Sequence, residues 1–315
     1  MSSNTCLALD LGGTKLLIGE VEESGRILKQ KRYDTGYLTQ AEEIERIQEC
    51  LDDYIRTVGF AGERPDQMGM GLIGQIDHSR GVWVMIDDRR RVPTPVTGLF
   101  QEKYGMRCQI DNDAKSAALA QKRFGAAKDT DHFIYLNIGT GIGAGFFENG
   151  RLIRGWQNDS GEVGHLTVDF HSDTVCFCGR RGCVEAISSG SGISSRFFAK
   201  IGEYPDSALR PYAEEKTIPA HAVFEAAKQG DPLAGLLTRD AADGAAALIL
   251  DLVRVSNPEK IILGGGVISN PDFYRMVCDR LDFFCMKSVL KGVELSQLDP
   301  QYTGLLGAAA VGFED

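Results

Sequence analysis

The sequence predicts an α/β protein made of two related halves. An apolar strand, a turn rich in glycine and a second strand open the chain over residues 5–21, and the same pattern returns over residues 133–148. Segments with the helical spacing of apolar residues occur in both halves. Glycines let a backbone approach a phosphate closely, so each half is expected to open with a phosphate-facing hairpin. Two such lobes would leave a cleft between them.

The first half contains most of the expected strands. Strands are predicted over residues 5–11, 15–21 and 26–33, with a hairpin turn at Gly25. Apolar residues at helical spacing predict a helix over 41–58. Further expected elements are strands over 67–72 and 106–111, a loop punctuated by Pro93 and Pro95, and a helix over 114–124 that Gly125 stops.

The second half is expected to be more helical after its opening hairpin. Asn149-Gly150 is a hairpin-turn signal, and a short strand is predicted over 151–153. The remaining expected elements are helices over 220–229, 233–255 and 303–313, and an apolar strand over 261–268 that contains three glycines. The sequence has no low-complexity linker, so a domain boundary is expected near residues 111–116.

Composition limits the classes of function. A chain of 315 residues is long enough for two domains, and 37 glycines indicate many tight turns. The net charge of −10 argues against nucleic acid as the main partner, because phosphate contacts require clustered Lys and Arg. No apolar stretch has the length of a membrane span, and the first residues do not form a signal peptide.

The eight cysteines indicate a cytoplasmic, reducing location. Five are scattered in apolar or helical contexts and are interpreted as buried thiols. The other three, Cys176, Cys178 and Cys183, are spaced like metal ligands and follow His165. One His and three Cys have the number and type of a four-coordinate structural zinc site.

Two acids lie beside these candidate ligands. Glu162 belongs to the segment 161–165, and Glu185 follows the last cysteine of the cluster. A zinc that joins the two loops would also fix the two carboxylates, as binding of sugar hydroxyls requires. In the alternative interpretation, the acids only orient the zinc ligands.

The opening strand carries Asp10 and leads into Gly12-Gly13-Thr14-Lys15. This spacing fits neither the P-loop nor the dinucleotide-binding fingerprint. Asp10 is a candidate for binding Mg²⁺ through water, or else a buried strand acid. Lys15 is interpreted either as a phosphate donor or as a lysine at a strand edge.

Five segments together carry a family resemblance: 10–15, 111–114, 137–144, 161–183 and 261–267. In this order and spacing they resemble the ROK family (repressors, open reading frames and sugar kinases), over essentially the whole chain. The resemblance implies the actin-like ATPase fold, with two ribonuclease-H-like lobes around a central cleft. It also implies ATP-dependent phosphorylation of a sugar hydroxyl.

The resemblance assigns roles to particular positions. Asp113 resembles the catalytic base, although an aspartate before a helix is also a preferred N-cap and both roles can coexist. The implied sugar-binding residues are Asn112, Glu162, His165 and Glu185, and the implied zinc ligands are His165, Cys176, Cys178 and Cys183. The implied ATP-binding residues are Asp10, Gly12, Gly13, Thr14 and Lys15 in the first phosphate loop, Thr140 and Gly141 in the second, and Gly264, Gly265 and Gly266 near the adenosine.

The resemblance also implies domains, cofactors and partners. The expected lobes are residues 1–113, completed by a C-terminal helix at about 301–315, and residues 114–300 with the zinc site. ATP, Mg²⁺ and structural Zn²⁺ are expected, in a homodimer or homotetramer. The expected substrate is a hexose or hexose derivative: glucose first, then N-acetylmannosamine, fructose or allose.

Two other classes of function use the same fold. ROK repressors carry an additional N-terminal helix-turn-helix domain, and the first strand here starts at about residue 5, which leaves no room for one. A sugar-responsive regulator without catalysis is kept as the alternative function. A chaperone or cytoskeletal ATPase on the same fold would not explain the zinc cluster or the paired acids.

The chain departs from the family pattern on its expected sugar side, which makes the identity of the sugar uncertain. The segment 71–77 lacks the usual Pro-Gly, and 85–93 has Asp87 or Asp88 where an asparagine is usual. Arg89–Arg91 are interpreted as a solvated basic loop, or else as a preference for an acidic or phosphorylated substrate. His78, His132, His171 and His221 are expected to be surface or core residues.

Overall fold

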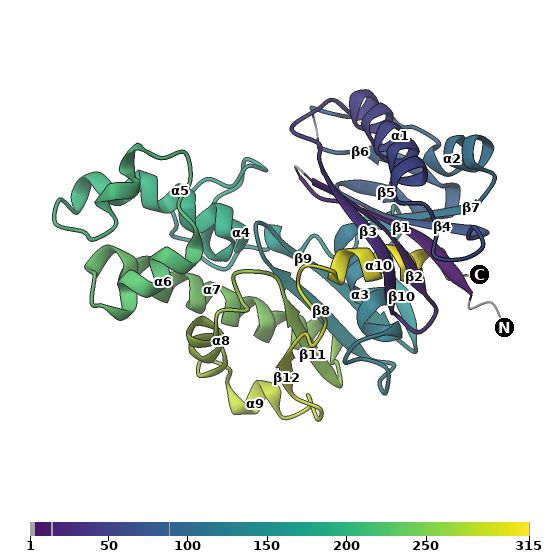
Figure 1. The fold of residues 1–315 in the computed structure, drawn as a ribbon. Helices are drawn as coiled ribbons and strands as arrows, with labels where there is room; N and C mark the ends of the chain where they lie inside the picture. Colours follow the sequence, from purple (N-terminus) through teal and green to yellow (C-terminus); the bar gives the residue numbers. More distant parts are fainter. Residues whose placement is uncertain (1–3, 14, 88, 315) are drawn as a thin grey trace. The chain divides into compact units, whose positions relative to one another are not determined.

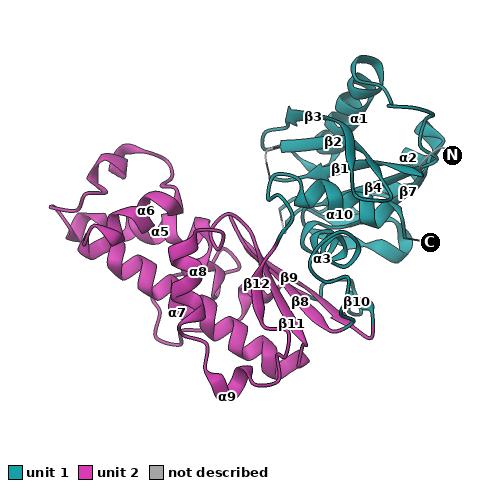
Figure 2. Ribbon diagram, turned by 60° about the horizontal axis from the view of Figure 1, so that its bottom comes forward, with its two compact units in different colours: residues 1–131, 150–160, 297–315 teal, residues 132–149, 161–296 magenta. Residues whose placement is uncertain are grey.

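The structure is a computed structural model that describes residues 4–13, 15–87 and 89–314. The chain forms two compact units (Figure 2). Unit 1 comprises residues 1–131, 150–160 and 297–315, and unit 2 comprises residues 132–149 and 161–296. Thr14, an expected phosphate-loop residue, and Asp88 lie outside the described residues.

Unit 1 is built on a five-stranded sheet with the order β3-β2-β1-β4-β7 (Figure 1). β1 is antiparallel to β2 and parallel to β4, and β4 is parallel to β7. The strands are β1 (Thr5–Leu11), β2 (Lys15–Glu22), β3 (Ile27–Asp34), β4 (Gln67–Leu72) and β7 (Arg107–Asn112).

Alternate residues of the central strand β1 cover opposite faces of this sheet, as the two-residue period of a strand requires. Leu7 and Leu9 belong to the core cluster formed with α1 (Gln40–Thr57) and α2 (Val96–Tyr104). Cys6 and Ala8 belong to the cluster formed with α3 (Asp113–Arg123) and α10 (Thr303–Gly312). Helices therefore cover both faces of the sheet.

Glycines allow α10 to lie unusually close to its neighbours. A Cβ atom on Gly69 of β4 would collide with the Ala308 carbonyl oxygen of α10. A Cβ atom on Gly307 would approach the Ser116 carbonyl carbon of α3 to 2.6 Å. The C-terminal helix is thus an integral part of unit 1, packed against both the sheet and α3.

The sheet of unit 2 repeats the strand arrangement of unit 1. Its strands β8 (Phe133–Ile138), β9 (Ile142–Glu148), β11 (Lys260–Gly264) and β12 (Val293–Leu295) are hydrogen-bonded in the order β9-β8-β11-β12. β8 is antiparallel to β9 and parallel to β11, which is parallel to β12. Strands β2-β1-β4-β7 have the same relations, so the internal repeat expected from the sequence is present.

The helices of unit 2 surround a large apolar core that includes much of α7. They are α4 (Glu185–Ser188), α5 (Gly190–Lys200), α6 (Ala220–Lys228), α7 (Pro232–Ser256), α8 (Pro271–Cys278) and α9 (Phe283–Met286). The remaining elements are β5 (Gln75–Asp77), β6 (Val82–Met85), β10 (Arg151–Ile153) and the 3-10 helices η1 (His78–Arg80), η2 (Val163–His165), η3 (Ile201–Glu203) and η4 (Arg210–Glu214).

The bounds of two expected elements differ from the structure for physical reasons that can be identified. α3 begins at Asp113 rather than at residue 114, because Asn112 is the residue that caps it. The strand expected over 261–268 ends at Gly264, because Gly265 has φ +100° and turns the chain out of the extended conformation.

The compact units divide the chain at places other than the expected 113/114 boundary. α3 and the residues up to 131 lie in unit 1, because α3 packs extensively against α10. Residues 150–160, which follow the β8–β9 hairpin, also lie in unit 1.

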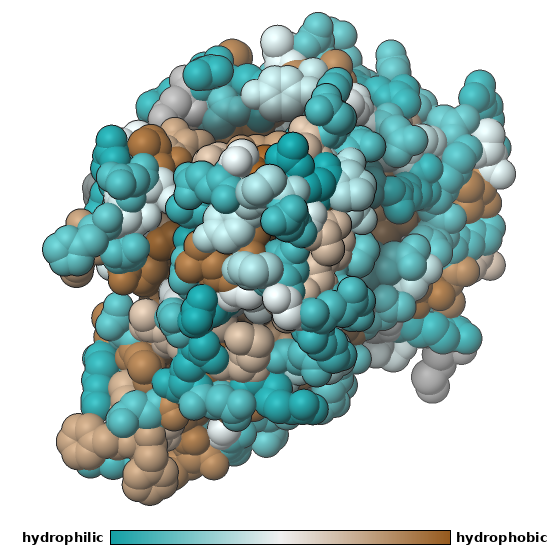
Figure 3. All heavy atoms as spheres, turned by 90° about the vertical axis from the view of Figure 1, so that its left-hand side faces the viewer, coloured by the Kyte–Doolittle hydropathy of each residue, from teal (hydrophilic) through white to brown (hydrophobic). Residues whose placement is uncertain are grey.

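The described surface includes exposed large apolar side chains such as Trp156 and Phe170. Figure 3 shows one face, on which hydrophilic residues predominate and apolar residues form separate patches. Among the described helices, none is both long and apolar enough to cross a lipid bilayer.

Candidate functional site

The junction of β7 and α3 in unit 1 carries the expected base, Asp113, and the expected sugar-binding residue Asn112. Asn112 is buried, and its side-chain oxygen accepts hydrogen bonds from the N–H groups of Ala114 (3.0 Å) and Lys115 (3.3 Å). Its amide nitrogen donates to the Gly74 carbonyl at 3.0 Å. The side chain interpreted as a sugar contact is therefore the helix N-cap, a role for which asparagine is well suited.

Asp113 is the first residue of α3, and its side chain is exposed. Its carboxylate accepts a hydrogen bond from the Ala114 N–H at 2.9 Å. Protein atoms packed around the carboxyl raise its pKa, and the Ala114 N–H and the charge of Lys115 oppose that rise.

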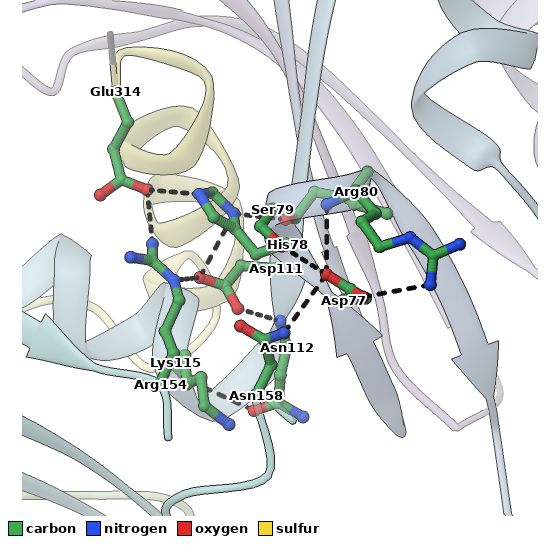
Figure 4. Close-up of polar contacts among 11 residues, drawn as sticks. Asp77, His78, Ser79, Arg80, Asp111, Asn112, Lys115, Arg154, Asn158 and Glu314 are labelled. Carbon is green, nitrogen blue, oxygen red and sulfur yellow. Dashed lines mark hydrogen bonds and ion pairs between the residues drawn. The ribbon is translucent and has the colours of Figure 1, made fainter. Parts of the chain in front are cut away.

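A buried charge network contacts this junction through Asp111 (Figure 4). Asp111, fully buried at the end of β7, accepts a hydrogen bond from the Asn112 N–H at 2.8 Å and another from Arg154 Nε at 2.8 Å. The same guanidinium donates to Glu314 at 2.7 Å. His78 Nδ1 lies 2.8 Å from the Ile110 carbonyl oxygen and 3.8 Å from the Asp111 carboxylate.

His78, Asp111 and Glu314 are close enough together to suggest a metal site. The guanidinium of Arg154 already bridges the two carboxylates and so supplies the positive charge that a metal would bring. We therefore interpret this cluster as a structural ion-pair network. His78, expected to be a surface or core residue, is half-buried and belongs to this network.

The first glycine turn lies near Asp10 in the same unit. The Gly12 N–H donates to the Lys15 carbonyl oxygen at 2.9 Å, and the Lys15 side chain, at the start of β2, is exposed. Burial, followed by repulsion from Asp113, raises the pKa of Asp10 to about 7. The absence of a Cβ on Gly304, at the start of α10, leaves the space that the Asp10 carboxylate occupies.

The second glycine turn, in unit 2, borders a cavity of about 510 Å³. The N–H groups of Gly190 and Ser191, at the start of α5, donate to the carbonyl oxygens of Gly139 (2.8 Å) and Thr140 (3.1 Å). The cavity is lined by Gly139, Thr140, Gly190, Ser191, Ser194, Ser195, Phe198, Gly266, Val267 and residues 216–221. Two expected nucleotide residues, Thr140 and Gly266, thus share one pocket.

Gly265, beside this pocket, requires its glycine. A Cβ atom there would lie 2.5 Å from the Ile138 carbonyl oxygen, at a φ of +100° that other residues rarely adopt. The Val267 N–H then bonds to the same carbonyl at 3.1 Å. The turn after β11 is thereby fixed against the end of β8.

A separate cavity of about 440 Å³ in unit 1, near Arg26 and Glu63, contains none of the expected site residues.

Glu185 links two of the expected segments of unit 2. Its carboxylate accepts a hydrogen bond from the Ile142 N–H at 2.7 Å, immediately after Gly141. A Cβ atom on Gly141 would lie 2.8 Å from the same carboxylate, so glycine is required for this approach. Glu162 is exposed and precedes η2, in a segment whose Gly161 carbonyl accepts a bond from the Ala144 N–H at 2.9 Å.

The His/Cys cluster of unit 2 has the dimensions of a zinc site. Cys178 Sγ lies 3.7 Å from Cys183 Sγ, and Cys176 Sγ lies 3.6 Å from His165 Nδ1. The four ligand atoms all lie within 4.8 Å of one another. Sulfurs bound at about 2.3 Å to one tetrahedral zinc are about 3.8 Å apart, so the donor set and spacing fit the metal.

Part of the basic loop has a structural role. Arg90 makes a bidentate contact with Asp87, at 2.8 and 2.6 Å, which is the main reason that the pKa of Asp87 is lowered. Its guanidinium also donates to the Leu38 carbonyl and lies 4.1 Å from the centre of the Tyr37 ring. Arg89 and Arg91 are exposed, and their role in substrate binding stays a prediction.

The expected residues thus form one group within each unit. Unit 1 holds Asp10, the first glycine turn, Asn112 and Asp113, whereas unit 2 holds the second glycine turn, Gly264–Gly266, Glu162, Glu185 and the zinc cluster. Sequence reasoning missed Arg154, Glu314, Lys115 and the pocket residues of α5. None of these belongs to a recognisable motif.

Comparison with known proteins defines the family. The model of the ROK family matches residues 6–312. The chain belongs to the ROK family. It is 34% identical over 269 residues to a glucokinase of Thermotoga maritima, covering 83% of this chain and 81% of that protein. It is 27% identical over 313 residues to an N-acetylmannosamine kinase of Citrobacter koseri, covering 98% and 99%.

Solved structures of the family confirm the actin-like ATPase fold of this ROK protein. A Streptomyces griseus ROK glucokinase in complex with glucose and AMPPNP matches with a TM-score of 0.78 and 28% identity, covering 98% of this chain and 99% of that one. A ROK transcriptional regulator, a homologue of the Escherichia coli MLC protein, matches with a TM-score of 0.82 and 26% identity. The match covers 98% of this chain and 77% of the regulator.

Proposed function

We propose that this ROK protein is an ATP-dependent sugar kinase. It transfers the γ-phosphate of ATP to a hydroxyl of a hexose or hexose derivative. The observation that carries the proposal is the exposed carboxylate of Asp113 at the rigid β7–α3 junction, backed by the buried Asp111–Arg154 ion pair. The glucokinase and N-acetylmannosamine kinase relatives support the same chemistry.

The chemistry assigns one proton acceptor. A sugar hydroxyl is a weak nucleophile at neutral pH, so its proton must leave as its oxygen bonds to the γ-phosphorus. The carboxylate of Asp113 accepts that proton, and the bond between the γ-phosphorus and the bridging oxygen breaks, releasing ADP. A base at the first residue of a capped helix has a fixed position, which favours an in-line reaction.

The nucleotide binds in part through the cavity of unit 2. A pocket of about 510 Å³ lined by glycine, serine and apolar side chains is of a size that suits an adenosine. The first glycine turn of unit 1 offers backbone N–H groups to phosphate oxygens. Asp10 is the carboxylate that would hold Mg²⁺ through water, and Mg²⁺ would neutralise phosphate charge during transfer.

Zinc has a structural role in this proposal. His165, Cys176, Cys178 and Cys183 would hold the metal with four protein ligands, as in structural zinc sites. The metal would then fix the loops next to Glu162 and Glu185, which we propose as sugar-binding acids of unit 2. Glucose is the first expected substrate, followed by N-acetylmannosamine, fructose and allose.

The similarity to a ROK regulator favours one alternative, a sugar-responsive regulator without catalysis. Both functions require sugar binding, but only the kinase releases ADP. A coupled assay of ADP release over a panel of neutral, acidic and phosphorylated hexoses separates them. We expect sugar-dependent ADP release, with zinc at about one per chain by metal analysis.

The Asp113→Asn variant, purified identically, serves as the control for contaminating kinases. Sugar binding without ADP release in the wild-type protein would contradict the kinase and favour the regulator. Turnover confined to acidic or phosphorylated sugars would contradict glucose as substrate and assign a role to Arg89 and Arg91.

A further inference from the structure

Cys178 differs from the other cysteines of the chain in its exposure. Among the described cysteines it alone is exposed, whereas Cys176 and Cys183 of the same cluster are buried. Its sulfur lies 3.7 Å from the sulfur of Cys183. Susceptibility of a cysteine to oxidation follows its exposure and its thiolate character, and a zinc ligand is a thiolate. The His/Cys cluster therefore places a second sulfur directly beside an accessible one.

The turn that carries Cys178 has little packing around it. The Cys176 N–H donates to the Arg180 carbonyl oxygen at 2.8 Å, which closes the turn. The side chain of Phe177 is 81% exposed, and a Cβ atom on Gly179 would meet no atom of the described chain within 4 Å apart from its neighbours. To form a disulfide of about 2.0 Å from a separation of 3.7 Å, the sulfurs must approach by about 1.7 Å. Exposed residues can make this shift without displacing the core.

The same cluster lies between the two acids proposed to bind sugar. Backbone hydrogen bonds of 2.9 Å join residues 166–168 to residues 182–184. Glu185 directly follows the second of these stretches, and Glu162 precedes the first. Metal held by His165 and the cysteines would add a further link between the stretches, so its loss would loosen the residues on which both acids lie.

We propose that Cys178 and Cys183 form an oxidation site, in which a disulfide replaces zinc when the protein meets a peroxide. The Cys178 thiolate attacks one oxygen of hydrogen peroxide, and the O–O bond breaks. Cys178 becomes a sulfenic acid, and the released hydroxide takes up a proton to give water. The Cys183 thiolate then attacks the Cys178 sulfur, the S–S bond forms, and the S–O bond breaks to release a second hydroxide, which is also protonated to water.

This sequence of steps passes two electrons from the sulfurs to the peroxide. Only His165 and Cys176 then remain to hold zinc, which is too few for a closed site, so the metal leaves. A dithiol reductant returns both thiols. The weaker sugar binding that should follow rests on the proposed kinase function, whereas the disulfide and the release of zinc do not depend on catalysis.

Two variants provide matched controls. Cys178→His removes the exposed sulfur but keeps four ligands, in the His₂Cys₂ set that occurs in structural zinc sites. Cys278→Ser removes a half-buried thiol that lies outside the cluster. The first variant should keep its zinc at a peroxide concentration that empties the wild type, and the second should lose zinc as the wild type does.

The experiment treats the purified protein with hydrogen peroxide and follows zinc release with a chromogenic chelator. Peptide mass spectrometry after alkylation locates the disulfide, and calorimetry measures sugar affinity. We expect release of about one zinc per chain together with a disulfide between Cys178 and Cys183. Sugar affinity should fall by at least about tenfold. Dithiothreitol with added zinc should restore the zinc content and the sugar affinity.

Several results would overturn this inference. They are a purified chain without zinc, zinc that stays bound under peroxide, and a disulfide that joins Cys178 to Cys176 instead. If Cys178→His does not fold, timed alkylation of the wild type decides, because Cys178 must be the first thiol that peroxide consumes. Unchanged sugar affinity after zinc release would overturn the link to sugar binding. If the wild type phosphorylates no sugar, the kinase proposal fails, whereas zinc release with the expected disulfide still supports the oxidation site.

Discussion

The start of α3 in unit 1 and the 161–185 segment in unit 2 hold carboxylates by different means. At the start of α3, the position of Asp113 follows from a strand, a capped helix and the buried Asp111–Arg154 ion pair. The 161–185 segment has only a one-turn 3-10 helix and isolated bridges, and its own apolar cluster consists of Cys176, Cys183 and Ala186. Regular structure and buried charge position the carboxylate in unit 1, whereas we propose that a metal does so in the 161–185 segment.

The largest expected effect is on the chemistry at the start of α3. Asp113→Asn keeps the size of the side chain and leaves the Asn112 cap intact, but removes the proton acceptor. We expect kcat to fall by at least about 10², while melting temperature, zinc content and sugar affinity stay at wild-type values. Steady-state kinetics measure kcat, and calorimetry measures the melting temperature and the sugar affinity. A variant that keeps more than about a tenth of wild-type kcat would show that the base lies elsewhere.

Loss of the metal should affect the 161–185 segment and not the start of α3. Cys183→Ser removes a buried ligand, so zinc content should fall and amide exchange should rise across 161–185, with loss of sugar affinity. Exchange at the start of α3 should not change. Cys278→Ser, outside the cluster, is the control. If the zinc-free variant binds sugar with unchanged affinity, the zinc does not shape the sugar site.

Breaking the ion pair behind α3 tests whether that region depends on it. Arg154→Ala leaves the fully buried Asp111 carboxylate without its cation. The free energy of unfolding should decrease by about 3 kcal/mol, as measured by urea denaturation. The double variant Arg154→Ala with Asp111→Asn should recover part of this loss, because no buried charge remains. Equal stability of wild type and Arg154→Ala would mean that the pair does not hold the junction.

The smallest expected effect is a pH dependence from Asp10. Its pKa in the folded protein is about 7, against an ordinary value of 3.8. Between these values the folded state holds a proton that the unfolded state has lost, so this group makes stability decrease as pH rises through that window. Asp10→Asn should therefore raise the melting temperature relative to wild type more at pH 8 than at pH 4.

The exposed Asp34, on β3 of the same unit, provides the control for this pH series. Asp34→Asn should show no such trend. A difference between Asp10→Asn and wild type that is the same at pH 4 and pH 8 would contradict a raised pKa at Asp10.

Local patterns in the sequence were sufficient for much of the fold. The helices expected over 41–58, 220–229 and 303–313 are confirmed within one residue at each end, because apolar spacing determines them. α2 and α5 were missed, since Gly98 in the first and Gly190 with Gly192 in the second resemble loop sequence. Packing against the core overrides that local preference.

The site was predictable only where its residues are neighbours in sequence. Asn112 and Asp113 could be located from their motif, but Arg154 is 43 residues from Asp111 and 160 from Glu314. Only the folded backbone brings such charges together. The burial of Lys115 likewise has no signal in sequence, because a lysine in an amphipathic helix is usually solvated.

The close packing of α10 has a consequence for synthesis of the protein on the ribosome. Residues 303–312 are translated after every residue of unit 2, yet they cover one face of the unit 1 sheet. Unit 2 can therefore finish folding first, while the part of the unit 1 sheet that α10 covers, including Gly69, is still exposed. A nascent chain that stalls before residue 303 would present this apolar face to chaperones and proteases, so incomplete copies would be recognised by their exposed sheet.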